Sequence, residues 1–359
     1  MKALTAIAIS GGVDSMMAAH RLLQEGHAVI GIHFITGYEA AAAPFPAGTS
    51  PSDRTETTAE KISGLAGRLG IPFEIIDLSS RFREDVIRYF TGSYVKGLTP
   101  NPCMVCNPRI KFGALFDFAR KLGAERLATG HYARIRTDDS GRFHLLRGVD
   151  RAKDQSYFLA FLNQKQLARA VFPLGGLTKA SVKAMAVANG LKPVTAGESQ
   201  DICFIRGLSY GEFLSRQPEF TPRPGPIEDL GGNILGRHNG LHLFTIGQRR
   251  GINCPAAEPY YVVRIDTREN RLIVGFKTDL GASHCRVTDI NWINGRPAAP
   301  LKVRTRVRYR HQSAPSTVMP LDERSAVVTF DEPEAAITPG QGAVFYQGDE
   351  VLGGGWISG

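Results

Sequence analysis

The hexapeptide Ser-Gly-Gly-Val-Asp-Ser at residues 10–15 constrains the fold of this chain more than any other stretch. An apolar run at residues 3–9 precedes it and predicts a buried strand. Residues 16–24 follow it with the apolar spacing of an amphipathic helix. A strand, a glycine-rich turn and a helix in this order typically begin an α/β domain, in which ligands bind at the carboxyl ends of the strands.

The same turn has the chemistry of an anion site. Gly11 and Gly12 let backbone N–H groups approach a phosphate, and the start of the helix adds a partial positive charge. Ser10 and Ser15 can donate hydroxyl hydrogen bonds, and Asp14 can hold a Mg²⁺ ion shared with the phosphates. No Gly-Lys-Ser/Thr follows, which excludes the phosphate loop of kinases and GTPases. A tight turn without a ligand is the alternative.

The pattern resembles the PP-loop of ATP pyrophosphatases, which cleave ATP to AMP and pyrophosphate while they adenylate a carbonyl oxygen. The resemblance implies that ATP and Mg²⁺ bind here.

The composition describes a globular protein with a basic balance. The chain has 359 residues, enough for two or three domains, and a formal net charge of +9. Such a charge favours a polyanionic partner, although an ordinary basic protein would have it too. Five cysteines do not make a disulfide framework, and no apolar stretch approaches the length of a membrane span. We therefore expect a cytoplasmic protein that makes no membrane contact, and we expect a monomer.

Strand-like and helix-like segments alternate over about the first 205 residues, which predicts a doubly wound parallel sheet of the PP-loop ATP pyrophosphatase type. The strands are expected at residues 28–34, 73–77 and 125–129, and the helices at residues 57–69, 81–90 and 112–122. Short alternating strands later in the chain predict a small linking domain and a C-terminal β-barrel. The expected domains are 1–205 for ATP binding and catalysis, 206–277 in the centre and 278–359 for the C-terminal barrel.

One late segment, residues 301–310, alternates cations with apolar residues. As a single strand it would place five cations on one face, with a spacing of about 6.6 Å that is close to the phosphate spacing of a nucleic acid. We expect this face to bind RNA or DNA; protective cations on a barrel edge are the alternative. The five cations are Lys302, Arg304, Arg306, Arg308 and Arg310.

Three cysteines are candidates for chemistry. Cys103 and Cys106 form a Cys-x-x-Cys pair, which serves equally as a redox pair, half a zinc site or part of an iron–sulfur site. Cys203 lies in a separate motif, Ser-Gln-Asp-Ile-Cys-Phe at residues 199–204. Cys254 and Cys285 are expected to be packing residues.

An ordered set of motifs across essentially the whole chain resembles the tRNA-specific 2-thiouridylases. The motifs are SGGVDS (10–15), TPNP with a following CN (99–107), IKF (110–112), ATGHYA (128–133), KDQSYF (153–158), SQDICF (199–204) and TIGQRRG (245–251).

The resemblance implies a reaction. ATP adenylates O2 of the wobble uridine of tRNA, and a sulfur atom replaces the resulting AMP. By resemblance, Cys203 carries the sulfur as a persulfide received from a sulfur-relay protein. Inorganic sulfide is the alternative sulfur donor. Cys106 is the nucleophile or resolving thiol and closes a disulfide with Cys203. Such thiols react well when positive surroundings lower their pKa.

The resemblance also implies binding residues. Those for ATP are Ala8, Ile9, Ser10, Gly11, Gly12, Val13, Asp14, Ser15, Phe34 and Gly130. Those for tRNA are Asn101, Pro102, Cys103, His131, Lys153, Asp154, Gln155, Arg308, Tyr309 and Gln341.

One position departs from the family pattern, because Cys103 stands where many members have a catalytic Asp. Two versions of the chemistry follow. Either the persulfide route operates without that carboxylate, or Cys103, Cys106 and Cys203 ligate a [4Fe–4S] cluster whose open iron binds sulfide. Two other functions also remain: a PP-loop synthetase or amidotransferase for a small molecule, and a non-catalytic tRNA-binding protein.

Overall fold

The computed structural model describes residues 3–39, 51–192, 202–205, 207–217 and 220–358, and of residues 51–59 only the backbone. The chain forms two compact units, each assembled from three segments. The first unit comprises Met1–Val86, Cys103–Gly207 and Gly348–Leu352, and the second comprises Ile87–Pro102, Leu208–Gln347 and Gly353–Gly359.

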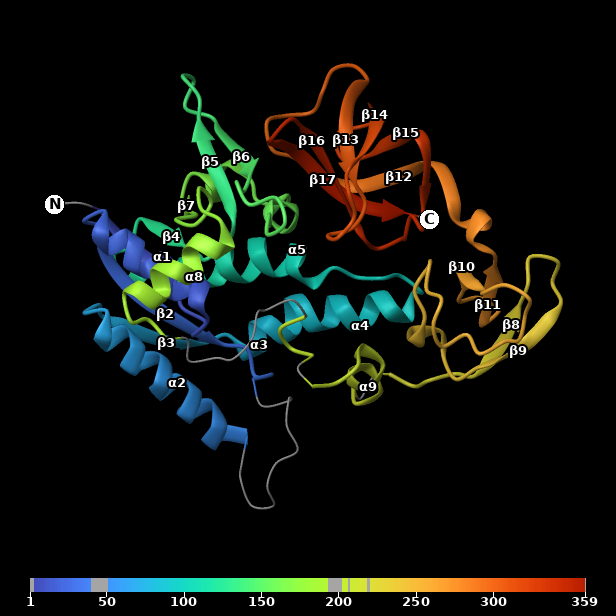
Figure 1. Ribbon diagram of the computed structural model, residues 1–359, viewed down its shortest axis with the longest axis horizontal. Coiled ribbons are helices and arrows are strands. Elements are labelled where there is room, and N and C mark those ends of the chain that lie inside the picture. The colour runs from blue at the N-terminus through green and yellow to red at the C-terminus, as the bar shows by residue number, and fades with distance from the viewer. Residues whose placement is uncertain (1–2, 40–50, 193–201, 206, 218–219, 359) are drawn as a thin grey trace. The chain divides into compact units, whose positions relative to one another are not determined.

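A parallel sheet lies at the centre of the first unit (Figure 1). Its strand order is β3-β2-β1-β4-β7, and every neighbouring pair is parallel, which confirms the predicted fold class. The strands are β1 (Leu4–Ala8), β2 (Ala28–Ile35), β3 (Phe73–Asp77), β4 (Arg126–Ala128) and β7 (Ala170–Val171).

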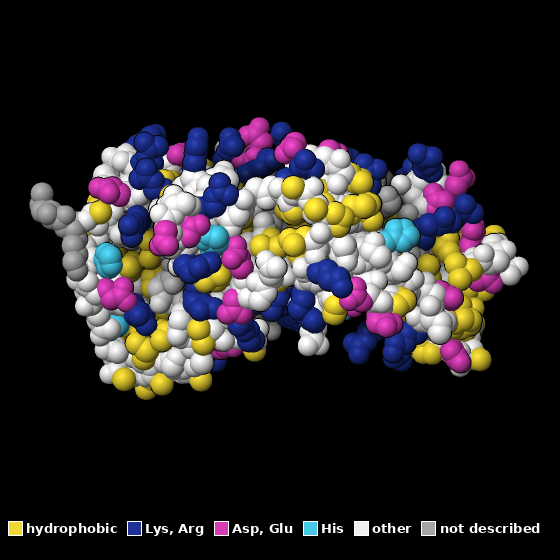
Figure 2. All heavy atoms as spheres, turned by 90° about the horizontal axis from the view of Figure 1, so that it is seen from above, with side chains coloured by type: hydrophobic (Ala, Val, Ile, Leu, Met, Phe, Trp, Pro, Cys, Tyr) yellow, Lys and Arg dark blue, Asp and Glu magenta, His cyan; other side chains and the backbone are white. Residues whose placement is uncertain are grey.

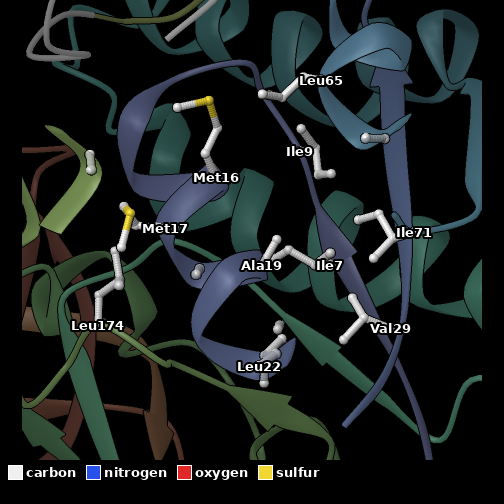
Figure 3. Packing of buried hydrophobic residues seen from close by; sticks show 14 of the residues in the cluster. Ile7, Ile9, Met16, Met17, Ala19, Leu22, Val29, Leu65, Ile71 and Leu174 are labelled. Atoms are coloured by element: carbon white, nitrogen blue, oxygen red, sulfur yellow. The ribbon is translucent and has the colours of Figure 1, made fainter. Parts of the chain in front are cut away.

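The core of this unit forms around α1 (Val13–Gln24), the helix that follows the hexapeptide. Figure 3 shows Met16, Met17 and Leu22 of this helix in the core, with Leu22 near Val29 of β2 and Met17 beside Leu174. The side chains of all three are almost completely excluded from solvent. Burial on this scale fixes where α1 begins, and therefore fixes the turn between β1 and α1.

The helices of the first unit and its border are more broken than the sequence predicts. The expected helix at 81–90 is a succession of α3 (Ser79–Phe82), a wider π-type turn at Arg83–Ile87 and α4 (Arg88–Val95). The cysteine pair lies on α5 (Pro102–Cys106), which leads into a second π-type stretch (Asn107–Leu115) and α6 (Phe116–Lys121). The remaining elements are α2 (Pro51–Arg68), β5 (Ala133–Thr137), β6 (Phe143–Arg147), α7 (Gln164–Leu167) and α8 (Lys179–Ala188).

The second unit contains the small linking domain. Its four strands have the order β10-β11-β8-β9 around a core that includes Ile227, Phe244 and Leu272. The elements are α9 (Tyr210–Ser215), β8 (Gly225–Glu228), β9 (Ile234–His238), β10 (Tyr261–Asp266) and β11 (Arg271–Gly275).

A six-stranded barrel follows, with the order β12-β15-β14-β13-β16-β17, and it closes because β12 also pairs with β17. The predicted C-terminal barrel is confirmed. Its strands are β12 (Gly281–Trp292), β13 (Leu301–Arg306), β14 (Ala314–Pro320), β15 (Ala326–Ala335), β16 (Gly342–Gln347) and β17 (Glu350–Ser358). Glu350 and Val351 at the start of β17 belong to the first unit, where they pair with β6.

The predicted row of five cations on one strand is wrong. Strand β13 ends at Arg306, so Arg308 and Arg310 lie in the turn that follows. The Arg304 guanidinium donates to the carbonyl of Ser313, and that of Arg306 donates to the carbonyl of Tyr309. Turn carbonyls that leave the sheet need donors, and these two arginines supply them.

Across the part of the chain that is described, none of the helices combines the length and apolar character that a bilayer crossing demands.

Candidate active site

The turn between β1 and α1 is organised as an open anion site. Gly11 has a positive φ of 79°, which glycine adopts at little cost. The Ser15 hydroxyl accepts from the Ser10 N–H at 3.2 Å and donates to the Gly12 carbonyl at 3.0 Å, so these two serines brace the turn. Gly12 caps α1 without any side-chain hydrogen bond. The N-cap residue therefore supplies no side-chain acceptor to the first N–H groups of the helix, which suits them to an incoming anion.

Asp14 is paired within the protein. Both of its carboxylate oxygens lie 2.7 Å from Nζ of Lys179, at the start of α8. The Tyr132 hydroxyl donates to one of them at 2.8 Å. Lys179 did not emerge from the sequence, because 165 residues separate it from Asp14 and it belongs to none of the motifs singled out there.

Gly130 packs closely against the phosphate loop, whereas Phe34 lies on the strand next to β1. A Cβ on Gly130 would come within 2.9 Å of the Asp14 carbonyl carbon and 3.0 Å of the Ser15 nitrogen. Only glycine therefore lets this segment approach the phosphate loop so closely. Phe34 is half-buried near the carboxyl end of β2, the strand that pairs with β1.

Cys103 and Cys106 are held as neutral thiols. Cys103 and Cys106 are half-buried on α5, whereas Cys203 is exposed. Burial raises the pKa of Cys103 to about 12, and the neighbouring Cys203 adds to the effect. Burial likewise raises the pKa of Cys106 to about 12, opposed by Lys111 and reinforced by the two other thiols. In the free protein, burial therefore outweighs the effect of Lys111 on the pKa values of Cys103 and Cys106.

Lys111 reaches His131 as well. Its Nζ lies 3.3 Å from Nε2 of His131, and Nδ1 of the same ring lies 2.7 Å from the Thr129 hydroxyl. Burial, with Lys111 second, lowers the pKa of His131 well below its usual range. The ring is therefore neutral, with Nε2 accepting from Lys111 and Nδ1–H donating to Thr129. The sequence pointed to the IKF motif but assigned no role to its lysine.

Aromatic packing anchors the segment that carries Cys203. The next residue, Phe204, is buried, and its ring centroid lies 5.8 Å from that of Phe82 and 6.2 Å from that of Tyr38. Residues 199–201 of the same motif lie outside the described residues.

Two side chains of the Lys153-Asp154-Gln155 turn hold it in place through hydrogen bonds to backbone N–H groups. The Asp154 carboxylate is buried and accepts from the Gly148 and Ser156 N–H groups at 3.1 Å each. The Gln155 side-chain oxygen accepts from the Tyr132 N–H at 3.0 Å. Lys153 is half-exposed. A tRNA contact at this turn stays a prediction, and of the three side chains it is Lys153 that reaches solvent as a charge.

The second unit brings the predicted tRNA contact Gln341 close to the segment that holds two others, Asn101 and Pro102. The Gln341 amide donates to the carbonyls of Thr99 and Pro100 at 3.1 and 3.3 Å, directly before the buried Asn101 and Pro102. The Asn101 N–H donates to the Tyr89 hydroxyl at 3.2 Å. Arg308 is exposed and Tyr309 half-buried in the turn after β13.

On the face that Figure 2 shows, surface charge alone does not single out a binding region. Figure 2 shows Lys and Arg side chains scattered among Asp and Glu over the visible face.

The described residues contain no group of three or more His, Cys, Asp or Glu that could hold a metal ion. In this arrangement the three cysteines do not fit a [4Fe–4S] cluster, which needs its thiolates gathered around one site. Asp14 fits a Mg²⁺ ion in the usual manner, because that ion takes one or two carboxylates together with the substrate's phosphates.

Three families match the chain in succession. The tRNA methyl transferase HUP domain matches residues 3–207, the tRNA methyl transferase PRC-barrel domain matches 211–276, and the aminomethyltransferase beta-barrel domain matches 282–357. Among solved structures, an NMN synthetase from Francisella tularensis aligns at 14% identity with a TM-score of 0.35, over 59% of this chain and 71% of that chain. That likeness is too low to carry an argument.

Whole-chain relatives share one description. The tRNA-specific 2-thiouridylase MnmA of Desulfosudis oleivorans is 51% identical over 99% of this chain and 94% of its own length. The proteins of that description from Geobacter metallireducens and Syntrophotalea carbinolica are 45% and 46% identical over 98% of this chain, and over 95% and 97% of their own lengths. Identity at this level along nearly the whole length establishes that the chain belongs to the family of tRNA-specific 2-thiouridylases.

Proposed function

We propose that this chain is an ATP-dependent tRNA 2-thiouridylase, which replaces O2 of the wobble uridine with sulfur. The observation that supports the proposal is that Cys103, Cys106 and Cys203 belong to the same compact unit as the phosphate loop. About a hundred residues separate Cys203 from the pair, yet it acts on the pKa values of both thiols. Family membership and the tRNA-specific description of the relatives support the substrate class.

The first step is activation of the base. O2 of uridine attacks the α-phosphorus of ATP, pyrophosphate departs, and the oxygen becomes part of an adenylate. The open N–H groups at the start of α1 suit the phosphates, and Asp14 would hold a Mg²⁺ ion that neutralises them. Adenylation turns a poor leaving oxygen into AMP, a good one.

The second step is sulfur transfer. The terminal sulfur of a persulfide on Cys203 attacks C2, and AMP leaves with the original O2. The Cys106 thiolate then attacks Sγ of Cys203, so the bond between Sγ and the transferred sulfur breaks. The sulfur stays on C2 as 2-thiouridine, and the two cysteines close a disulfide. The sulfane sulfur is thereby reduced by two electrons while the two thiols are oxidised, and an external thiol must reduce the disulfide before the next turnover.

Burial of the thiols bears on this chemistry. A neutral Cys106 is unreactive until it loses a proton, and Lys111 is the nearby cation that favours its thiolate. A bound tRNA would also exclude water from the adenylated base, which is prone to hydrolysis.

The cluster version is not carried forward, because the three thiols are not arranged as a ligand set among the described residues.

The test is nucleoside mass spectrometry of unmodified tRNA incubated anaerobically with the protein, Mg-ATP and a sulfur source. One arm contains polysulfide, which can load a persulfide on Cys203, and a second arm contains sulfide alone. The proposal expects an oxygen-to-sulfur mass shift on uridine in the polysulfide arm and release of one AMP per sulfur. Cys106→Ser and Cys203→Ser should abolish the shift, and Cys254→Ser, at a cysteine outside the three, should keep it.

Other results would overturn parts of the proposal. Turnover with sulfide alone that needs reconstituted iron would replace the persulfide route by a cluster, whereas an active Cys103→Asp variant would favour the persulfide route. Pyrophosphate release that depends on a small molecule and not on tRNA would indicate a synthetase or amidotransferase. Binding of tRNA without AMP formation would indicate a non-catalytic tRNA-binding protein.

A further inference from the structure

Lys179 is a nearly buried lysine whose ammonium group faces the phosphate loop. Its side chain is 10% exposed, and Nζ lies 2.7 Å from both carboxylate oxygens of Asp14. An ammonium so far from water needs a fixed anionic partner, and in the absence of ligand Asp14 fills that role.

Backbone and side-chain contacts fix the position of Lys179. Its N–H donates to the Asp150 carboxylate at 2.9 Å. Thr178 and Ser181 cap the helix reciprocally, each accepting from the other's N–H at 3.1 Å. Nζ also lies 5.8 Å from the ring centroid of Tyr132, whose hydroxyl donates to Asp14. The ammonium is therefore held in place before any ligand arrives.

The phosphate loop itself has no cation. Residues 8–15 carry a single charged side chain, Asp14, and it is negative. Phosphate loops of the Gly-Lys-Ser/Thr type contain their own lysine, which reaches the phosphates. A polyphosphate that approaches this loop would meet backbone N–H groups but also a carboxylate, and a cation from elsewhere in the fold would offset that repulsion.

We propose that Lys179 is a phosphate-binding residue of the ATP site, and that its ammonium passes from Asp14 to the polyphosphate when the nucleotide binds. The inference rests on the proposed function, because it takes ATP as the ligand. The exchange leaves Asp14 free for the Mg²⁺ ion that accompanies the nucleotide, with the Tyr132 hydroxyl still holding the carboxylate. The competing account is a purely structural ion pair between α1 and α8.

The test measures ATP affinity by isothermal titration calorimetry, with and without Mg²⁺. Loss of a charge-assisted contact predicts that Lys179→Met weakens ATP binding by about tenfold to a hundredfold. Adenosine, which has no phosphate, should bind Lys179→Met and wild type equally. The matched control is Lys183→Met, at an exposed lysine four residues along α8, and its ATP affinity should equal that of wild type.

A double-mutant cycle separates the two accounts. If Lys179 acts only through Asp14, then Lys179→Met has no further effect on ATP binding in an Asp14→Asn background. If it binds phosphate, the loss persists in that background. The double variant also keeps the test decisive should Lys179→Met alone fail to fold, because it leaves no buried charge unpaired.

The outcomes distinguish this inference from the proposed function. Wild-type protein that binds ATP while Lys179→Met binds it equally well would overturn the role of Lys179 and leave the proposed function intact. Wild-type protein with no measurable ATP affinity would overturn both.

Discussion

Nζ of Lys111 lies 3.3 Å from Nε2 of His131, and this pair connects the cysteine site with the segment that packs against the phosphate loop. Lys111 sits four residues after Asn107, within the π-type stretch that follows Cys106. Its charge opposes the effect of burial on both Cys103 and Cys106, and it also disfavours a second positive charge on His131. One ammonium therefore acts on three titrating groups.

Lys111→Met should make the thiols harder to ionise and His131 easier to protonate. The pKa of Cys106 should rise, because the cation that favours the thiolate is gone, and the pKa of His131 should rise for the same electrostatic reason. Alkylation of Cys106 by iodoacetamide, followed as a function of pH, should shift to higher pH. Lys121→Met, at an exposed lysine on α6, is the control. An unshifted alkylation profile would mean that Lys111 does not act on Cys106.

The buried thiols should make the protein less stable at alkaline pH. The pKa of each thiol is higher in the folded protein than in the unfolded chain. Their contribution to the free energy of unfolding is therefore complete below pH about 9 and is lost as the pH rises towards about 12. Each thiol should lower the free energy of unfolding by about 1.4 kcal/mol per pH unit in that window. Urea unfolding of wild type and Cys106→Ala under reducing conditions at pH 8 to 10 measures the difference. The prediction would be contradicted if the free energy of unfolding fell with pH at the same rate in the two proteins.

Gly130→Ala should disturb the phosphate loop. The new Cβ would lie 2.9 Å from the Asp14 carbonyl carbon, so backbone must move. Overpacking of this kind costs about 1–3 kcal/mol of stability, and the displaced loop should bind ATP more weakly. Thermal unfolding and ATP titration check both effects. In Gly176→Ala, the matched control, the added methyl meets nothing within 4 Å, so this variant should behave as wild type.

Gln341→Ala should weaken tRNA binding more than it weakens the fold. It removes two hydrogen bonds to the carbonyls of Thr99 and Pro100, about 1 kcal/mol each, and releases the segment before Asn101. Filter binding of tRNA and thermal unfolding measure the two effects. Gln347→Ala is the control, because that glutamine is exposed at the end of β16. Unchanged tRNA affinity together with a lowered melting temperature would limit Gln341 to a structural role.

Regular patterns in the sequence predicted the regular parts of the fold. Strand β3 has the predicted bounds, and the parallel order around β1 follows from alternating strands and helices. The predicted strand at residues 301–310 ends at Arg306, because alternation of charge continues past the point where hydrogen bonding to β14 ends. Periodicity reports which face a residue would take, but not whether a partner strand is present.

The sequence predicted which residue types make up the site, but not which of these residues pair with one another. The phosphate loop and the three cysteines carry their chemistry in their own motifs. The ion pair of Asp14 with Lys179 joins positions 165 residues apart, and only the tertiary fold brings them together. The direction of the thiol pKa shifts was equally inaccessible, since it depends on how deeply α5 is buried.

The path of the chain through its two units has a consequence for how the protein is made. The first unit is complete only when Gly348–Leu352 arrives, and this short segment provides Asp349 to Arg134 and Glu350 to His144. The first unit therefore stays partly assembled until this segment has been synthesised, which happens only after the whole of residues 208–347. A fragment cut after Gly207 would lack that segment for good, so the two halves of the sequence are not independent folding modules.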